Sequence, residues 1–165
     1  MNEKSLEEKR MDDILKKYNN SIDSKVHEDL VKALFEEDVE YSLEHISRNY
    51  IEAFKDIKTD TFWIDRESEL LGAIIGYIKN VYQENSSKRN LNEIVNFLIY
   101  NDFVNYQNAS ELFELNNIKG EALELWNNYL EFTQSKYKRY VVGLGLIQKI
   151  RDSIMVEGIK NKKAI

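Results

Sequence analysis

The densest group of side chains that could do chemistry is acidic and comprises Glu36, Glu37, Asp38 and Glu40. Two carboxylates can act as general acid and general base when their surroundings push their pKa values apart, which requires burial of at least one of them. A run of charges at a helix end gives no sign of burial. The pattern therefore favours a solvated helix end first, a docking surface for a basic partner second, and an active site last.

The opposite charge gathers at the other end of the chain. Residues 134–165 contain eight Lys and Arg but only two Asp and Glu, a formal charge of +6, whereas the whole chain carries −6. A basic end of this kind can contact nucleic acid or the acidic part of the same chain, although a solvated helix surface is the simpler interpretation. The residues that we single out for a nucleic-acid contact are Lys136, Lys138 and Arg139.

Other chemistries lack a motif. The absence of Cys excludes a thiolate nucleophile and a thiolate metal site. The six Gly occur in neither phosphate-binding pattern, G-x-x-x-x-G-K-[ST] or G-x-G-x-x-G. The dimetal pattern Glu-x-x-His is also absent, because Ser24 and Ser42 stand three residues before His27 and His45, which we interpret as ordinary surface residues. We therefore expect no cofactor, no metal, no ATP binding and no enzymatic activity.

The segments that must position these residues have helical periods throughout. The chain contains no Pro, and no run alternates in the period-two manner of a strand. The sequence predicts an all-α, compact bundle of about six to eight helices that forms a single domain over residues 1–165. No stretch approaches the ~18 apolar residues of a membrane span, and the acidic start lacks a signal peptide, so we expect a cytoplasmic protein without membrane contact.

A long helix near residues 61–83 is predicted to be the centre of the bundle. Its apolar residues recur at three- and four-residue spacing and cover most of the circumference in its second half. Asp60 or Thr61 can cap its first turn. Gly72 and Gly76 leave a groove in which another helix can approach closely. Its polar, N-terminal half carries three acidic residues, which the helix dipole favours there: Asp65, Glu67 and Glu69.

Three helices are expected before the central one. A peripheral helix lies within residues 1–22 and is capped by Ser5. A second begins near Asp23 or Ser24 and ends at the acidic group, and a third covers residues 43–58.

After the central helix, residues 84–89 form the most polar loop, which we expect to be exposed and mobile. Short helices follow, the first of which is capped by Asn90. Ser135 caps a last long helix that ends near Gly158, before a loose tail at residues 159–165. The side chains that we expect on the buried face of this last helix are Tyr137, Val141, Leu144, Ile147, Ile150 and Ile154.

A more specific pattern runs through the middle of the chain. It consists of Asp60, Phe62 and Trp63, then Glu69-Leu70-Leu71-Gly72-Ala73-Ile74-Ile75 with Tyr77 and Ile78, and after a polar gap Arg89-Asn90-Leu91, Ile94, Val95 and Leu98. Weaker likeness continues through residues 111–115, 129–132 and 138–145. Over about residues 43–154 the chain resembles the all-α domain of type IV secretion coupling proteins, the TraG/VirD-like ATPases of bacterial conjugation.

In that family the helical domain is inserted into a RecA-like motor domain and helps to select substrate on the cytoplasmic side. The resemblance therefore implies a substrate-recruiting adaptor that recognises a relaxase, a relaxosome or a secreted effector protein. Contact with single-stranded DNA stays open, as does the oligomeric state. The alternative is a free-standing helical structural or regulatory protein of a phage or plasmid that acts through protein–protein contacts.

Overall fold

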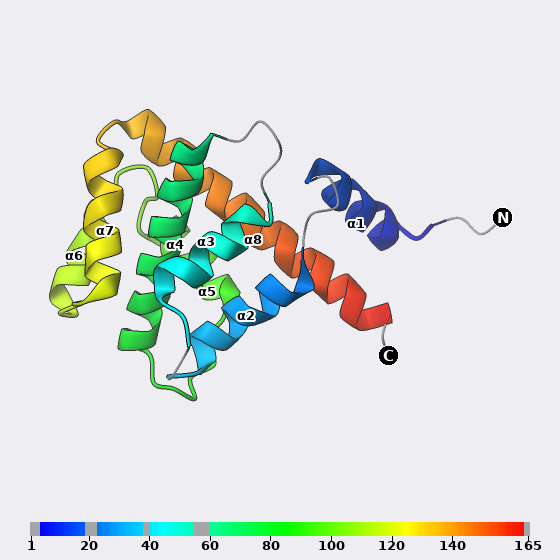
Figure 1. The fold of residues 1–165 in the computed structure, drawn as a ribbon, viewed down its shortest axis with the longest axis horizontal. Coiled ribbons are helices and arrows are strands. Elements are labelled where there is room, and N and C mark those ends of the chain that lie inside the picture. The colour runs from blue at the N-terminus through cyan, green and yellow to red at the C-terminus, as the bar shows by residue number, and fades with distance from the viewer. Residues whose placement is uncertain (1–3, 19–22, 38–39, 55–59, 164–165) are drawn as a thin grey trace.

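The computed structural model describes residues 4–18, 23–37, 40–54 and 60–163. Within these ranges the chain forms eight helices and no strand, which confirms the all-α prediction (Figure 1). The helices are α1 (Leu6–Lys17), α2 (Ser24–Phe35), α3 (Leu43–Glu52), α4 (Thr61–Val81), α5 (Leu91–Tyr100), α6 (Gln107–Leu115), α7 (Glu121–Phe132) and α8 (Lys136–Lys163).

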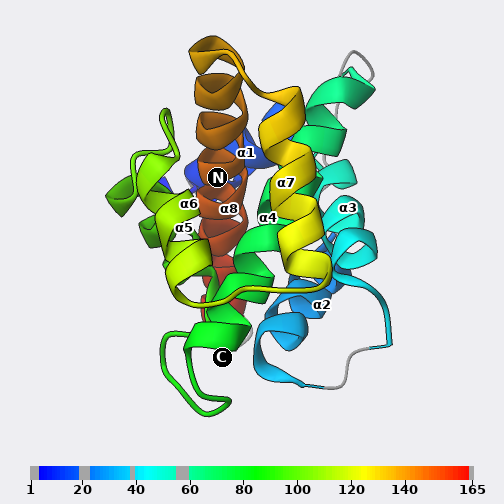
Figure 2. The same ribbon diagram turned by 90° about the vertical axis from the view of Figure 1, so that its left-hand side faces the viewer.

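Helix α4 is the centre of the bundle, as predicted. It packs most extensively against α3 and α7 and also contacts α2, α5 and α8. Helix α8 runs along the whole bundle, and α1 packs on its C-terminal half, away from α6 and α7 (Figures 1 and 2). No residue of α1 is fully buried, which confirms that this helix is peripheral.

Side-chain caps determine where most of the helices begin. The oxygens that accept hydrogen bonds from free backbone N–H groups of a first turn belong to Ser5, Asp23, Ser42, Asp60, Asn90 and Ser135. Helix α3 has a second cap from a distant helix, because the Glu121 carboxylate accepts from the backbone N–H groups of Leu43 at 2.8 Å and Glu44 at 3.4 Å. Helix α7 is thereby fixed against the N-terminus of α3.

The close approach predicted at the two glycines of α4 is made by α7. A Cβ atom at Gly76 would lie 2.4 Å from the Cβ of Ala122, and one at Gly72 would lie 2.7 Å from Cδ1 of Leu125. Both distances are shorter than van der Waals contact, so only glycine permits this packing of α4 on α7.

The predictions about the last helix are partly wrong. Ile147 and Ile150 lie on the buried face of α8, as predicted. Tyr137, however, is 71% exposed, and Val142 and Leu146 are buried where Val141 and Leu144 are expected. Residues 141–147 are almost wholly apolar, so periodicity alone does not identify the side that faces the core. Residues 159–163 of the predicted loose tail are helical, because α8 continues to Lys163, and residues 164–165 lie outside the described ranges.

The third helix is shorter than predicted. Helix α3 ends at Glu52, and Ala53 and Phe54 form a turn. Residues 55–59 of the predicted helix lie outside the described ranges. Phe54 is buried and packs edge-on against Tyr18 at 5.1 Å between ring centroids, which joins the end of α3 to the end of α1.

Candidate functional site

A cleft of about 500 Å³ lies between α2 and α3. Helix α2 contributes one wall and α3 the other, and the segment that joins the two helices forms its end. The side chains that line it are Lys25, Val26, Asp29, Lys32, Glu36, Glu40, Tyr41, His45, Ile46 and Asn49. We refer to it as the α2–α3 cleft. Its volume lies within the range of small-ligand sites, and it is open to solvent.

Two of the four predicted docking carboxylates belong to this cleft. Glu36 and Glu40 are exposed and lie at the end where α2 connects to α3. Neither carboxylate forms an ion pair with another described residue, although the backbone carbonyl of Glu36 accepts a hydrogen bond from Lys79 Nζ at 2.7 Å. The prediction that α2 ends at the acidic group is confirmed, because its last residue is Phe35.

Of the other two predicted residues, Glu37 does not line this cleft. Glu37 accepts a hydrogen bond of 2.8 Å from the guanidinium group of Arg89, on the side of α4. Asp38 lies outside the described residues. Among the described residues of this group, Glu36 and Glu40 therefore form an acidic pair at the cleft.

Aromatic side chains form the wall beside this acidic pair. The ring of Tyr41 stacks on that of His45, with 4.6 Å between centroids and 30° between planes, and Tyr41 is 54% exposed. Asn49 shares a hydrogen bond of 3.2 Å with Nε2 of His45 and holds the imidazole in place. His45 is exposed, as predicted. The sequence reasoning missed Tyr41, whose only available signal was its position directly after Glu40.

The α2 wall carries charges of both signs. Lys25, Asp29, Lys32 and Glu36 follow one another at three- and four-residue spacing on one side of the helix. Lys25 and Asp29 form an ion pair of 3.9 Å, which leaves them partly neutralised. The cleft is therefore most negative near Glu36, where the connection between the helices lies, and least negative at the opposite end.

Two of the three residues predicted to contact nucleic acid are exposed, and the contact itself stays a prediction. Lys136 and Lys138 are exposed, and Lys138 Nζ lies 5.1 Å from the ring centroid of Phe62. Arg139 is half-buried. Burial raises the pKa of the Tyr106 and Tyr129 hydroxyls, and the nearby charge of Arg139 lowers it in part. The aromatic side chains exposed at this end of the bundle are Phe132, Tyr137 and Tyr140.

The polar loop after α4 is not wholly exposed. Arg89, expected in an exposed and mobile loop, is 2% exposed. Its guanidinium group donates to the carbonyls of Lys79 at 2.8 Å, Tyr82 at 3.0 Å and Leu34 at 3.4 Å. It thus satisfies backbone acceptors at the C-terminal ends of both α4 and α2.

Two charged side chains in the polar half of α4, Arg66 and Glu67, are buried, which the sequence did not predict. Glu67 is 4% exposed and accepts a hydrogen bond of 2.9 Å from Lys149 of α8. Burial raises the pKa of the Glu67 carboxyl, and the ammonium group of Lys149 lowers it in part. A Cβ at position 145 would lie 2.4 Å from Glu67 Oε1, so Gly145 makes the room for this carboxylate.

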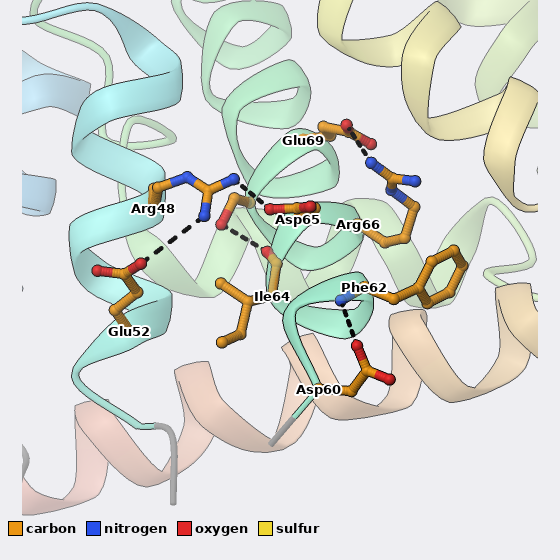
Figure 3. A network of polar contacts seen from close by, with 9 residues as sticks. Arg48, Glu52, Asp60, Phe62, Ile64, Asp65, Arg66 and Glu69 are labelled. Carbon is orange, nitrogen blue, oxygen red and sulfur yellow. Dashed lines mark hydrogen bonds and ion pairs between the residues drawn. The ribbon is translucent and has the colours of Figure 1, made fainter. Parts of the chain in front are cut away.

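A second polar network lies around the first turns of α4 (Figure 3). Arg66 is 8% exposed, pairs with Glu69 at 2.7 Å, and lies 4.3 Å from the ring centroid of Phe132. On another side of α4, Arg48 of α3 pairs with Asp65 (Figure 3). The Arg48–Asp65 pair is partly exposed, whereas Arg66 and Glu67 are buried. Because all of these charges have partners, we interpret them as structural contacts and not as an acid–base pair.

His27 is half-buried, not an ordinary surface residue as expected. Its Nδ1 shares a hydrogen bond with the hydroxyl of Ser153, which is fully buried in α8. Burial lowers the pKa of the His27 imidazole. Among the described residues, no three His, Asp or Glu side chains come together as a metal site would require. In the same ranges, no helix combines the length and apolar character needed to cross a membrane.

Comparisons with protein-family models, curated proteins and solved structures found no match to this chain. The fold belongs to the class of all-α multi-helix bundles. The parts of the molecule that can indicate a function are its surfaces. Two surfaces offer accessible charged groups: the α2–α3 cleft, and the start of α8 with Lys136 and Lys138.

Proposed function

We propose that this chain is a substrate-recruiting helical adaptor domain of a type IV secretion coupling protein, and that it binds a relaxase, a relaxosome component or a secreted effector on the cytoplasmic side. The observation that carries the proposal is the accessible acidic pair, Glu36 and Glu40, at the end of a concave cleft. The sequence resemblance over residues 43–154 supports the same assignment.

A cleft of this kind suits a basic protein partner better than a flat acidic surface would. Proteins that process DNA are often basic, and carboxylates without a partner attract such proteins from a distance. The concave walls of α2 and α3 add contact area once the partner has arrived. Recruitment of protein cargo requires both the accessible carboxylates and the concave walls. Electrostatic attraction sets the association rate, and shape complementarity sets the residence time.

The test is association kinetics with the relaxase encoded by the same conjugative element. Replacing Glu36 and Glu40 by Lys should slow association and reduce its dependence on salt, because these charges act mainly before contact. The matched control replaces Glu114 and Glu124 by Lys, which gives the same net charge on α6 and α7, away from the cleft. Equal association rates for the parent and the cleft variant, with normal circular dichroism in both, would overturn the proposal.

A second candidate function is contact with single-stranded DNA at the start of α8. The observation that favours it is the alternation of exposed Lys136, Tyr137, Lys138 and Tyr140, because aromatic rings can stack on bases while ammonium groups bind phosphates. Replacing Lys136 and Lys138 by Glu should then weaken binding of a labelled oligonucleotide. Unchanged binding at low salt would exclude this surface.

The free-standing phage or plasmid protein remains the competing proposal. It predicts that the chain acts through protein–protein contacts and is not joined to a RecA-like motor domain. Walker motifs encoded on both sides of this segment in one reading frame would favour the coupling-protein assignment, whereas an isolated reading frame and no binding to a relaxase would favour the competing proposal.

A further inference from the structure

The acidic end of the α2–α3 cleft combines two kinds of group that together recognise one side chain. Glu36 and Glu40 supply negative charge, and Tyr41 supplies an aromatic ring with more than half of its surface exposed. Each group also binds other ligands when it occurs alone. A planar cation, however, can pair with a carboxylate and stack on a ring at the same time.

We propose that this end of the cleft binds an arginine side chain of the basic partner. This inference rests on the proposed function, because the arginine belongs to the protein cargo that the domain recruits. The guanidinium group stacks on Tyr41 and donates to Glu36 and Glu40, and its aliphatic stem packs on an apolar side chain that lines the cleft.

The geometry of the wall favours arginine over lysine. The Tyr41 ring is held in place by its stack on His45, and Asn49 in turn holds His45, so the exposed surface of Tyr41 is a preformed platform. A guanidinium group is flat, weakly hydrated and able to stack, whereas an ammonium group is a strongly hydrated point charge. A preformed flat surface therefore binds the flat guanidinium group more tightly than the ammonium group.

The apolar and basic parts of the cleft determine how the rest of the peptide lies. Ile46, which follows Tyr41 closely along the chain, offers apolar contact for the stem of the arginine side chain. Val26 lies near the start of α2, at the other end of the cleft from Glu36, and offers apolar contact to another part of the peptide. Lys25 and Lys32, on the α2 wall, disfavour a second cation in the cleft and favour an acidic residue or a carbonyl. The cleft is thus suited to one arginine and not to a continuous run of basic residues.

The experiment is a chemical-shift titration of the whole chain, labelled with nitrogen-15. The probes are short acetylated and amidated Gly/Ser peptides with a single central arginine, lysine or citrulline. We expect shifts at the amides around Tyr41 and His45, and an affinity for arginine ~fivefold above that for lysine, the size of one exposed cation–π contact. The affinity for arginine should exceed that for uncharged citrulline by more than about tenfold.

Substitutions separate the two parts of the site. Tyr41→Leu should abolish the preference for arginine over lysine, and Glu36→Gln with Glu40→Gln should abolish the preference for arginine over citrulline. The matched controls are Tyr137→Leu, and Glu114→Gln with Glu124→Gln, which change exposed residues elsewhere and should alter neither ratio. Circular dichroism confirms that each variant is folded.

Three outcomes would overturn the inference. They are equal affinity for the arginine and citrulline peptides, shifts confined to residues outside the cleft, and an arginine preference that survives Tyr41→Leu. Sedimentation of the protein without peptide tests whether a second copy of the chain occupies the cleft. A dimer that the double Gln variant dissociates would assign the cleft to a second copy of the chain and also overturn the inference.

The same data keep this inference apart from the proposed function. If the relaxase responds to charge reversal at Glu36 and Glu40 but the peptides show no arginine preference, the adaptor function stands and the arginine site is wrong. If the peptides rank as expected but the relaxase binds the parent and the reversed variant equally, the arginine site stands and the adaptor function is wrong.

Discussion

The buried guanidinium group of Arg89 donates a hydrogen bond of 2.8 Å to the carboxylate of Glu37, which is 54% exposed. The same group donates to backbone carbonyls at the C-terminal ends of α2 and α4. Arg89 therefore joins α2, which forms one wall of the α2–α3 cleft, to the central helix α4. Its importance for stability comes from these carbonyls more than from the exposed carboxylate.

Arg89→Met should destabilise the protein by about 2–4 kcal/mol, because it leaves several buried carbonyl oxygens without donors. Glu37→Gln should cost less than about 1 kcal/mol, because the side chain at position 37 is more than half exposed and Gln can still accept a hydrogen bond from Arg89. Urea unfolding followed by circular dichroism measures both. A larger loss for Glu37→Gln than for Arg89→Met would show that the ion pair, and not the capping of the helix ends, is the main contact.

Glycine substitutions in α4 and α8 should change the free energy of unfolding in opposite directions. Gly76→Ala should cost about 1–3 kcal/mol from overpacking against Ala122, although alanine favours the helix by about 1 kcal/mol. Gly158→Ala should stabilise α8 by about 0.5–1 kcal/mol, because no atom lies within 4 Å of the added Cβ. Thermal unfolding compares the two. A gain for Gly76→Ala would contradict the close packing of α4 on α7.

Two core substitutions in α4 should lower the free energy of unfolding by different amounts. Ile74 is fully buried, so Ile74→Ala should cost about 2–5 kcal/mol. Trp63 is only partly buried in the first turn, so Trp63→Ala should cost less than the ~3–5 kcal/mol typical of a buried Trp. Urea midpoints test this order, and an unchanged midpoint for Ile74→Ala would contradict the central position of α4.

His27 should make stability depend on pH. Burial lowers the pKa of its imidazole in the folded state, with opposing influence from Glu157 and Glu28 and a further lowering by Lys160. The unfolded chain therefore binds the proton first. Stability should be fully present above the ordinary His pKa of about 6.5 and fall as the pH drops from there through the folded-state pKa.

The measurement is the free energy of unfolding between pH 7.5 and 5, taken from urea curves on a grid of about half a pH unit. His27→Gln should flatten the dependence in this window, while the exposed His45→Gln should leave it as in the parent. A parent whose stability rises over the same fall in pH would contradict a buried, neutral His27.

Local chemistry determined most of the secondary structure from the sequence alone. The caps at Ser5, Asp60 and Asn90 act within the first turn that they begin, so a few consecutive residues suffice to predict them. The apolar period and the missing prolines predicted the all-α fold for the same reason. The spacing of Gly72 and Gly76 predicted a close helix contact but did not identify α7 as the partner.

The tertiary structure alone decided which polar residues are buried. Glu67 and Lys149 are 82 residues apart in sequence, and Glu37 and Arg89 are 52 apart, so neither burial has a local signal. Where the partner of a buried charge lies far away in the sequence, only the tertiary structure can supply it. The same holds for the candidate site: sequence identified the charges at Glu36 and Glu40, but the fold of α3 against α2 placed Tyr41 beside them and made a cleft.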